Sequence, residues 1–289
     1  MELLSLAVWN GLSYGLLLFM LSAGLTVIFS MMGVLNFAHA SFYMVGAYLA
    51  SSLADVWGMG MALALAPLGV AALGAVFERQ CLRRVQSQGH VAELLLTFGL
   101  SFVLLEMVQW LWAHSAVAYR IPEALQGALF TLGDVPFPRY RGFIMAVSLL
   151  VFVGLWLVLM RTRTGLILQA ALTHPKAVEA LGHPVPRIFT GVFAAGAGLA
   201  GLAGVLGGNL WVTEPGMAAT VGSVIFVVIV VGGLGSLWGA LIASLALGLA
   251  QTLALEVVAL RALAPVLPFL LMVIVLVVRP QGLLGQREA

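Results

Sequence analysis

The sequence is poor in charge: charged residues make up 8% of its 289 positions, whereas hydrophobic residues make up 62%. Soluble domains carry about 25% charged residues, because a folded chain of this size needs a charged surface in water. Between Leu3 and Ala54 there is no Asp, Glu, Lys or Arg, and a bilayer core takes about 20 apolar residues as a helix. The composition therefore excludes a soluble protein and predicts a polytopic membrane protein.

Motifs for nucleotide binding and catalysis are missing as well. Because Lys176 is the only lysine, the chain cannot contain a G-x-x-x-x-G-K-[ST] phosphate-binding loop. It has no H-E-x-x-H or G-x-S-x-G motif, and its five histidines have no metal-ligand spacing. We therefore expect no enzyme activity, no cofactor and no metal. The single cysteine, Cys81, leaves no internal disulfide, and the net charge of +2 does not suggest a nucleic-acid partner.

What the sequence does have is a series of apolar segments without the alternation of membrane strands. They predict an all-α, polytopic membrane helix bundle with about eight to ten transmembrane or half-crossing helices, in a single transmembrane domain over residues 1–289. The first segment is expected to be a retained helix, since it is longer than the apolar part of a signal peptide. The segments are 3–32, 36–54, 60–77, 91–112, 142–160, 188–208, 218–233, 236–255 and 264–278.

Basic residues gather in three of the intervening segments. Because basic loops stay in the cytosol, we expect the loop 78–90, the loop 161–187 and the C-terminus to be cytosolic. Nine crossings with the N-terminus outside satisfy this orientation, and so does an even number with one re-entrant segment. The residues concerned are Arg79, Arg83, Arg84, Arg161, Arg163, Lys176, Arg187, Arg279 and Arg287.

The loop 161–187 is the longest polar stretch on this side. Pro175 suits the first turn of a helix and Gly182 can end one in the left-handed conformation, which predicts a helix over 175–181. A Leu/Ala-rich stretch at 165–172 precedes it. Two short helices flanked by arginines predict a small rigid knob that docks a cytosolic partner. The alternative is an amphipathic helix that rests on lipid headgroups.

A few polar residues interrupt the apolar segments. Asn36, His39 and Ser41 lie in GVLNFAHASF at 33–42, where broken helices in many transporters meet a substrate; the alternative is an ordinary interfacial turn. Glu93 and Glu106 lie inside another apolar segment. Since a carboxylate in hydrocarbon is costly, Glu106 is a further candidate for the substrate path, with a structural hydrogen bond as the alternative for both.

Glycines crowd the segment 188–208, and this spacing favours close packing of helices in lipid over a hinge.

Four stretches together resemble the branched-chain amino acid ABC transporter permease family of the LivH type. They are GLTVIFSMMGVLNFAHASFYMVGAYLA at 24–50, LLTFGLSFVLLE at 95–106, VVIVVGGLGSLWGALIAS at 227–244 and VVRPQGLLG at 277–285. The resemblance covers nearly the whole chain in the right order. It implies a multi-pass permease of the bacterial inner membrane in an ATP-driven importer for branched-chain amino acids or a related small polar solute.

The resemblance also implies partners: a second permease subunit, identical or homologous, two cytosolic ABC ATPase subunits that bind the ATP, and an extracytoplasmic solute-binding protein. Within the loop, two alanines and a later glycine resemble the family's coupling motif, although Gln169 stands where the family often has Glu or Arg. Ala40-Ser41 replaces the family's common Gly-Glu, which leaves the solute open. The residues expected to contact the ATPase are Ala170, Ala171, Lys176, Glu179 and Gly182.

Two other transport mechanisms fit a chain without a nucleotide site. A secondary transporter driven by an ion gradient would need buried, paired carboxylates, for which Glu93 and Glu106 are the only candidates. A passive channel would conduct the solute without partner subunits.

Overall fold

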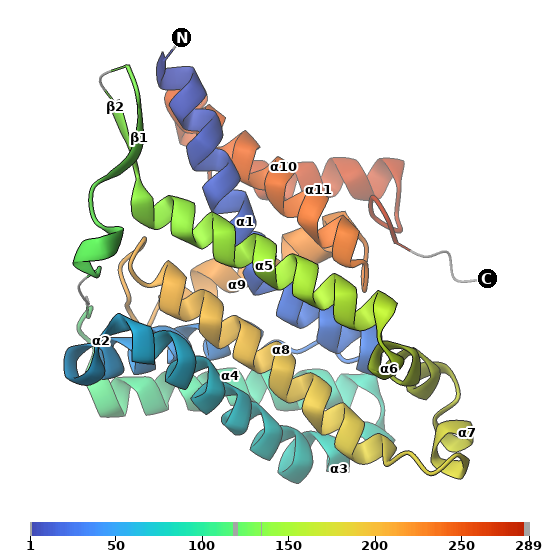
Figure 1. Ribbon diagram of the computed structural model, residues 1–289. Helices are drawn as coiled ribbons and strands as arrows, with labels where there is room; N and C mark the ends of the chain where they lie inside the picture. Colours follow the sequence, from blue (N-terminus) through green and yellow to red (C-terminus); the bar gives the residue numbers. More distant parts are fainter. Residues whose placement is uncertain (1, 118–120, 134, 286–289) are drawn as a thin grey trace. The chain divides into compact units, whose positions relative to one another are not determined.

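The computed structural model describes residues 2–117, 121–133 and 135–285, and Arg287 of the basic tail lies outside them. The described chain is almost entirely helical (Figure 1). It divides into two compact units, each made of segments that are distant in the sequence. The first unit contains Met1–Ser22, Ile121–Val151 and Ser223–Ala289, and the second contains Ala23–Arg120 and Phe152–Gly222.

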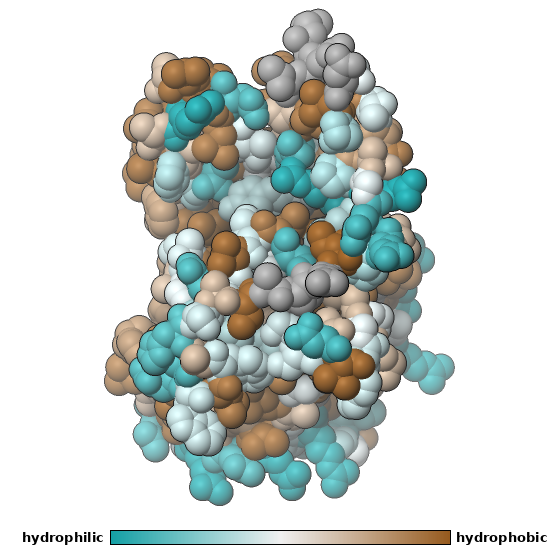
Figure 2. Space-filling view, turned by 90° about the vertical axis from the view of Figure 1, so that its left-hand side faces the viewer, coloured by the Kyte–Doolittle hydropathy of each residue, from teal (hydrophilic) through white to brown (hydrophobic). Residues whose placement is uncertain are grey.

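Six described segments are helical, long and apolar enough to cross a membrane, and they confirm the predicted helix bundle. Two shorter apolar helices, α9 (Met217–Gly232) and α11 (Leu267–Val278), accompany them. Hydrophobic side chains are exposed on the surface, as Figure 2 shows for one face, which is the arrangement expected for helices that face lipid. The six spans are Leu4–Met32, His39–Gln88, His90–Trp112, Arg139–Arg161, Val185–Gly207 and Leu237–Glu256.

The second unit is organised around α2 (His39–Phe77). The sequence predicted two segments here, at 36–54 and 60–77, and α2 does consist of two helical stretches that are joined by a sharp bend. The bend is at Gly58, whose φ of 79° and ψ of 164° are not helical. A glycine adopts this backbone conformation without the steric cost that a side chain would add.

The prediction of a loop at 78–90 is wrong, because the chain is helical over almost all of these residues. Arginine and glutamine are good helix formers. Only Gly89, with a φ of 96°, interrupts the helical conformation before the next membrane span. The elements are the π-helical turn η1 (Glu78–Leu82), α3 (Arg83–Val85), the 3-10 turn η2 (Gln86–Gln88) and then α4 (His90–Trp112).

Glycines let α2 pack directly against α8 (Val185–Gly207). A Cβ added to Gly204 would lie 2.1 Å from the carbonyl oxygen of Tyr43, and one added to Gly46 would lie 2.4 Å from that of Gly201. The two backbones therefore touch, as the glycine spacing at 188–208 predicted. Small residues allow this contact, which stabilises helix pairs in lipid.

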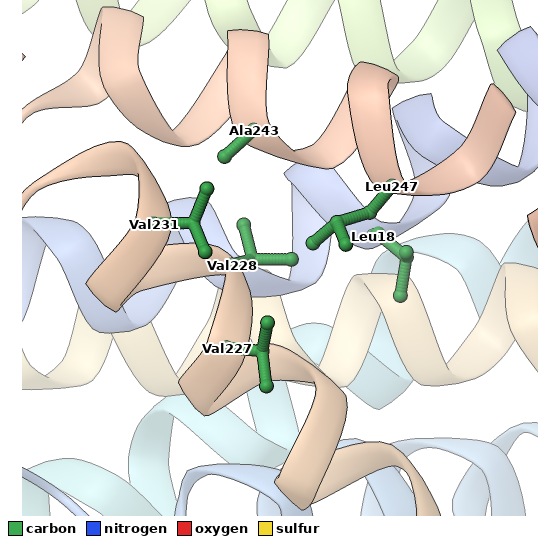
Figure 3. Packing of buried hydrophobic residues seen from close by; sticks show 6 residues of the cluster. All are labelled: Leu18, Val227, Val228, Val231, Ala243 and Leu247. Carbon is green, nitrogen blue, oxygen red and sulfur yellow. The ribbon is translucent and has the colours of Figure 1, made fainter. Parts of the chain in front are cut away.

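The first unit holds α10 (Leu237–Glu256), α11 and parts of three further helices. The helices that continue into the second unit are α1 (Glu2–Met32), α5 (Arg139–Arg161) and α9. Its core joins α1, α9 and α10, with residues of α11 packed against the outside. Figure 3 shows the six buried side chains, Leu18, Val227, Val228, Val231, Ala243 and Leu247.

A β-hairpin precedes α5, between the predicted apolar segments 91–112 and 142–160. Strand β1 (Ala128–Leu132) pairs antiparallel with β2 (Val135–Pro138). Phe130 and Phe137 stack with ring centroids 5.0 Å apart, and Trp9 of α1 meets Phe130 edge-on. Aromatic pairs of this kind stabilise short hairpins. Two single 3-10 turns lie in other connections, η3 (Glu123–Leu125) and η4 (Arg261–Leu263).

Candidate functional site

Two short helices follow the end of α5, where the sequence predicted a knob. They are α6 (Arg163–Thr173) and α7 (Pro175–Ala180). Thr162 starts α6: its hydroxyl oxygen accepts a hydrogen bond from the backbone N–H of Gly165 at 3.2 Å, which satisfies one of the free donors of the first turn. We call residues 163–182 the knob.

Local signals fix α7 as predicted. Pro175 occupies its first turn, and Gly182, with a φ of 86°, follows its end in the left-handed conformation. The helix stops at Ala180, one residue before the predicted end. His174 is the N-cap residue of α7, and its side chain makes no capping hydrogen bond.

A small apolar core holds the two helices together. Ala171 of α6, Val178 of α7 and Val185 at the start of α8 are buried against one another, and Ile167 and Phe189 pack around them. The knob is therefore a folded unit that is joined to the base of α8. This packing also explains the short helices, which would be unstable in isolation.

The five residues expected to contact an ATPase differ in their exposure. Ala170, Lys176, Glu179 and Gly182 are exposed on the knob, where a partner could reach them. Ala171 is only 1% exposed. Its side chain packs α6 against α7, so its small size shapes the knob from inside.

The knob also exposes apolar side chains, which the sequence analysis did not single out. Leu181 is 78% exposed and Leu166 is 66% exposed. Exposed leucines on an otherwise polar segment offer apolar surface that a partner or the lipid can cover. The nearby Arg163 and Lys176 are exposed as well and add positive charge.

The three polar residues at the start of α2 are brought together in the interior of the second unit. Asn36, His39 and Ser41 are each 3% exposed or less. The Oδ1 atom of Asn36 accepts a hydrogen bond from the backbone N–H of Ala38 at 3.1 Å. Its amide nitrogen has no hydrogen-bond partner among the residues that the structure describes, so a donor remains available in this buried place.

Other elements enclose this turn. The backbone N–H of Phe37 donates to Oγ1 of Thr97 on α4 at 3.3 Å. A Cβ added to Gly24 of α1 would lie 2.9 Å from the His39 ring and 2.4 Å from the carbonyl oxygen of Gly196 on α8. The turn therefore lies where α1, α2, α4 and α8 meet.

The two glutamates of α4 do not form a paired site. Glu93 is buried, and its Oε2 atom lies 3.2 Å from Nδ1 of His90. Glu106 is exposed, between the buried Leu104 and Val108, and the structure does not join it to the buried turn at Asn36. Within the described part of the chain, no three His, Cys, Asp or Glu residues lie together as metal ligands would.

The sequence analysis missed one buried polar cluster. Glu78 and Thr190 were not singled out, and Arg83 was counted only as a basic residue that orients the chain. Glu78 follows directly on α2, and a carboxylate at the end of an apolar helix, five residues before an arginine, is the one signal that could have indicated it.

Comparison with known proteins gives a consistent result over the whole chain. Residues 7–276 match the family described as "Branched-chain amino acid transport system / permease component". No solved structure matches the chain.

Curated relatives match along almost their full length. The high-affinity branched-chain amino acid transport system permease protein BraD of Pseudomonas aeruginosa is 30% identical over 96% of this chain and 95% of its own. LivH of Salmonella typhimurium, with the same description, is 28% identical over 97% and 95%. A probable branched-chain amino acid transport permease protein LivH of Methanocaldococcus jannaschii is 28% identical over 94% and 90%. The chain therefore belongs to the branched-chain amino acid transport permease family.

Proposed function

We propose that this chain is the membrane-spanning subunit of an ATP-driven importer for branched-chain amino acids or a related small polar solute. The relatives BraD and LivH are permease proteins of such amino acid transport systems. The observation that carries the proposal is the knob, a folded pair of helices with exposed leucines on a chain that has no phosphate-binding loop. A permease without a nucleotide site needs a separate motor, and the knob is a surface on which that motor can act.

In this proposal two cytosolic ATPase subunits bind the knob through Ala170, Lys176, Glu179 and Gly182, and through Leu181. Ala171 keeps the shape of the knob. The knob and the C-terminus then lie on the cytosolic side of the bacterial inner membrane. A second permease subunit and an extracytoplasmic solute-binding protein complete the importer.

Solute would pass near the buried turn of Asn36, His39 and Ser41. These side chains supply hydrogen-bonding groups inside an apolar bundle, and irregular backbone at membrane depth is tolerated where it is buried in protein or lines a cavity. The turn is closed in this structure, because all three are buried. ATP binding and hydrolysis favour different arrangements of the bundle, which open the path to one side and then to the other.

Uptake into lipid vesicles tests the function. The complex is reconstituted with ATP on the knob side, and labelled leucine is added on the other side with the solute-binding protein. We expect uptake that requires ATP. Uptake driven by an ion gradient without ATP would identify a secondary transporter instead, and downhill flux through this chain alone would identify a channel.

A pair of matched variants tests the role of the knob. Leu181→Asp introduces a charge on an exposed knob leucine, and we expect it to weaken ATPase binding at least about tenfold, as the loss of a central apolar contact does. Val258→Asp makes a similar change at a residue that is 82% exposed. Val258 lies between the predicted segments 236–255 and 264–278, outside the three basic stretches expected in the cytosol, so this variant should leave ATPase binding unchanged. Equal binding by both variants would refute the assignment of the knob.

A further inference from the structure

Three polar side chains meet where the chain leaves the knob and enters α8. Nη2 of Arg83 donates to both carboxylate oxygens of Glu78, at 2.9 and 3.2 Å. The same nitrogen lies 2.7 Å from the carbonyl oxygen of Pro186. Oγ1 of Thr190 lies 2.7 Å from Oε2 of Glu78. We call these residues the Glu78–Arg83–Thr190 cluster.

The cluster is built around a buried charge. Glu78 is 1% exposed, and the side chain of Arg83 is 34% exposed. A buried carboxylate is stable only when it is paired and hydrogen-bonded. The guanidinium group and the hydroxyl group satisfy it together, and the planar guanidinium also fixes the relative position of the groups that it joins.

The first turns of α8 connect the cluster to the knob. Val185 and Phe189 lie four residues apart on one row of the helix and pack against the knob. Pro186 and Thr190 form the adjacent row and meet Arg83. Because residues four apart stack on one face, the base of α8 is held by the knob on one side and by the cluster on the other.

On the far side of the cluster is α2, which ends directly before Glu78. The packing of α2 on α8 is close here: a Cβ added to Gly74 would lie 2.6 Å from Cβ of Ala197. The same α2 begins at His39, beside the buried turn of the proposed solute path. Phe193 of α8 connects the two places: its ring centroid lies 5.9 Å from that of Phe77, directly before Glu78, and 6.2 Å from that of Phe42 at the start of α2.

We propose that Glu78, Arg83 and Thr190 transmit movement of the knob to the α2–α8 pair, and thereby to the buried turn at Asn36 and His39. The inference rests on the proposed function, because it needs an ATPase that moves the knob. The three residues are positioning residues and do not touch the solute. Apolar side chains could hold α2 and α8 together equally well, but such contacts are not directional, whereas the hydrogen-bonded cluster fixes the register in which force passes.

The test separates transmission from simple stability. In the double variant Glu78→Leu/Arg83→Met both charges are removed, so no unpaired charge is left buried, and replacements of this kind are commonly neutral for stability. Thr190→Val keeps both charges and removes only the hydroxyl group. The control is Arg84→Met, which removes the exposed arginine next in the chain.

Each variant is reconstituted as the full transporter complex in vesicles, and three quantities are measured: assembled complex, ATP hydrolysis and labelled leucine moved per ATP. We expect the double variant to assemble and hydrolyse ATP but to move at least about fivefold less leucine per ATP, the low end of coupling between linked sites. Thr190→Val should show a smaller loss, and Arg84→Met none.

Two results would overturn the inference. One is a double variant that moves as much leucine per ATP as the wild-type complex. The other is a double variant that fails to assemble while Thr190→Val keeps the wild-type ratio, since the cluster would then serve folding alone. A wild-type complex without any ATP-dependent uptake would instead refute the proposed function, and the measurement on the wild type distinguishes the two failures.

Discussion

Replacing Gly204 by alanine should destabilise the packing of α2 on α8. The new Cβ would lie 2.1 Å from the carbonyl oxygen of Tyr43 and 2.8 Å from the backbone nitrogen of Ala47. Ordinary contacts begin near 3.4 Å, and backbone atoms cannot rotate away. The helices must therefore separate locally by about 1 Å, and overpacking of this kind costs about 1–3 kcal/mol.

The substitution also has a favourable effect, because alanine is a better helix former than glycine by about 0.5–1 kcal/mol. With rigid backbone atoms as the neighbours, the cost lies near the upper end of its range. We therefore expect the free energy of unfolding to fall by about 2 kcal/mol.

Gly191→Ala is the matched control on the same helix. A Cβ there has nothing within 4 Å, so only the helix propensity changes and the protein should gain about 0.5–1 kcal/mol. Both variants are unfolded in detergent micelles by increasing amounts of dodecyl sulfate, and helicity is followed by circular dichroism. If Gly204→Ala is as stable as the wild type, or if both variants shift in the same direction, the close packing of α2 on α8 is refuted.

Two further predictions concern Gly282 and Ser236 of the first unit and use the same unfolding assay. Gly282→Ala should lower the free energy of unfolding more than Gly33→Ala does. Both glycines have a positive φ, but only at Gly282 would a Cβ meet backbone, 2.5 Å from the nitrogen of Gly233. Equal losses of stability would contradict this prediction. Ser236→Ala should lower the free energy of unfolding by about 1 kcal/mol, and Ser236→Gly by only a few tenths of a kcal/mol. The reason is that the hydroxyl oxygen of Ser236 caps α10 by accepting a hydrogen bond from the backbone N–H of Gly239 at 3.0 Å. A Ser236→Ala variant as stable as the wild type would show that the cap does not stabilise α10.

The knob shows how far local signals reach. Pro175 and Gly182 act on their own backbone, through a fixed φ and a left-handed turn, so the sequence was enough to predict α7 to within one residue of its end. The exposure of Ala171 could not be predicted in the same way. Ala170 and Ala171 are adjacent and chemically identical, and only the packing of α6 on α7 decides that one is exposed and the other buried.

The glutamates show the same division more sharply. Glu106 was singled out because it interrupts an apolar segment, and it is exposed on α4. Glu78, at the edge of a basic stretch, received no role, yet it is 1% exposed. Its partners explain the difference, because Thr190 is 112 positions away in the chain and no local pattern reveals such a contact.

The sequence by itself determined that this is a membrane protein and where many of its helices lie. Membrane insertion depends on the number of apolar residues along one segment, and the start and end of a helix depend on neighbouring residues. Both can therefore be predicted from local sequence. The tertiary structure alone decided which polar groups are buried together, as at Asn36 and at the Glu78–Arg83–Thr190 cluster. The physical reason is that a buried polar group is stable only beside partners, and the folded chain brings those partners from distant segments.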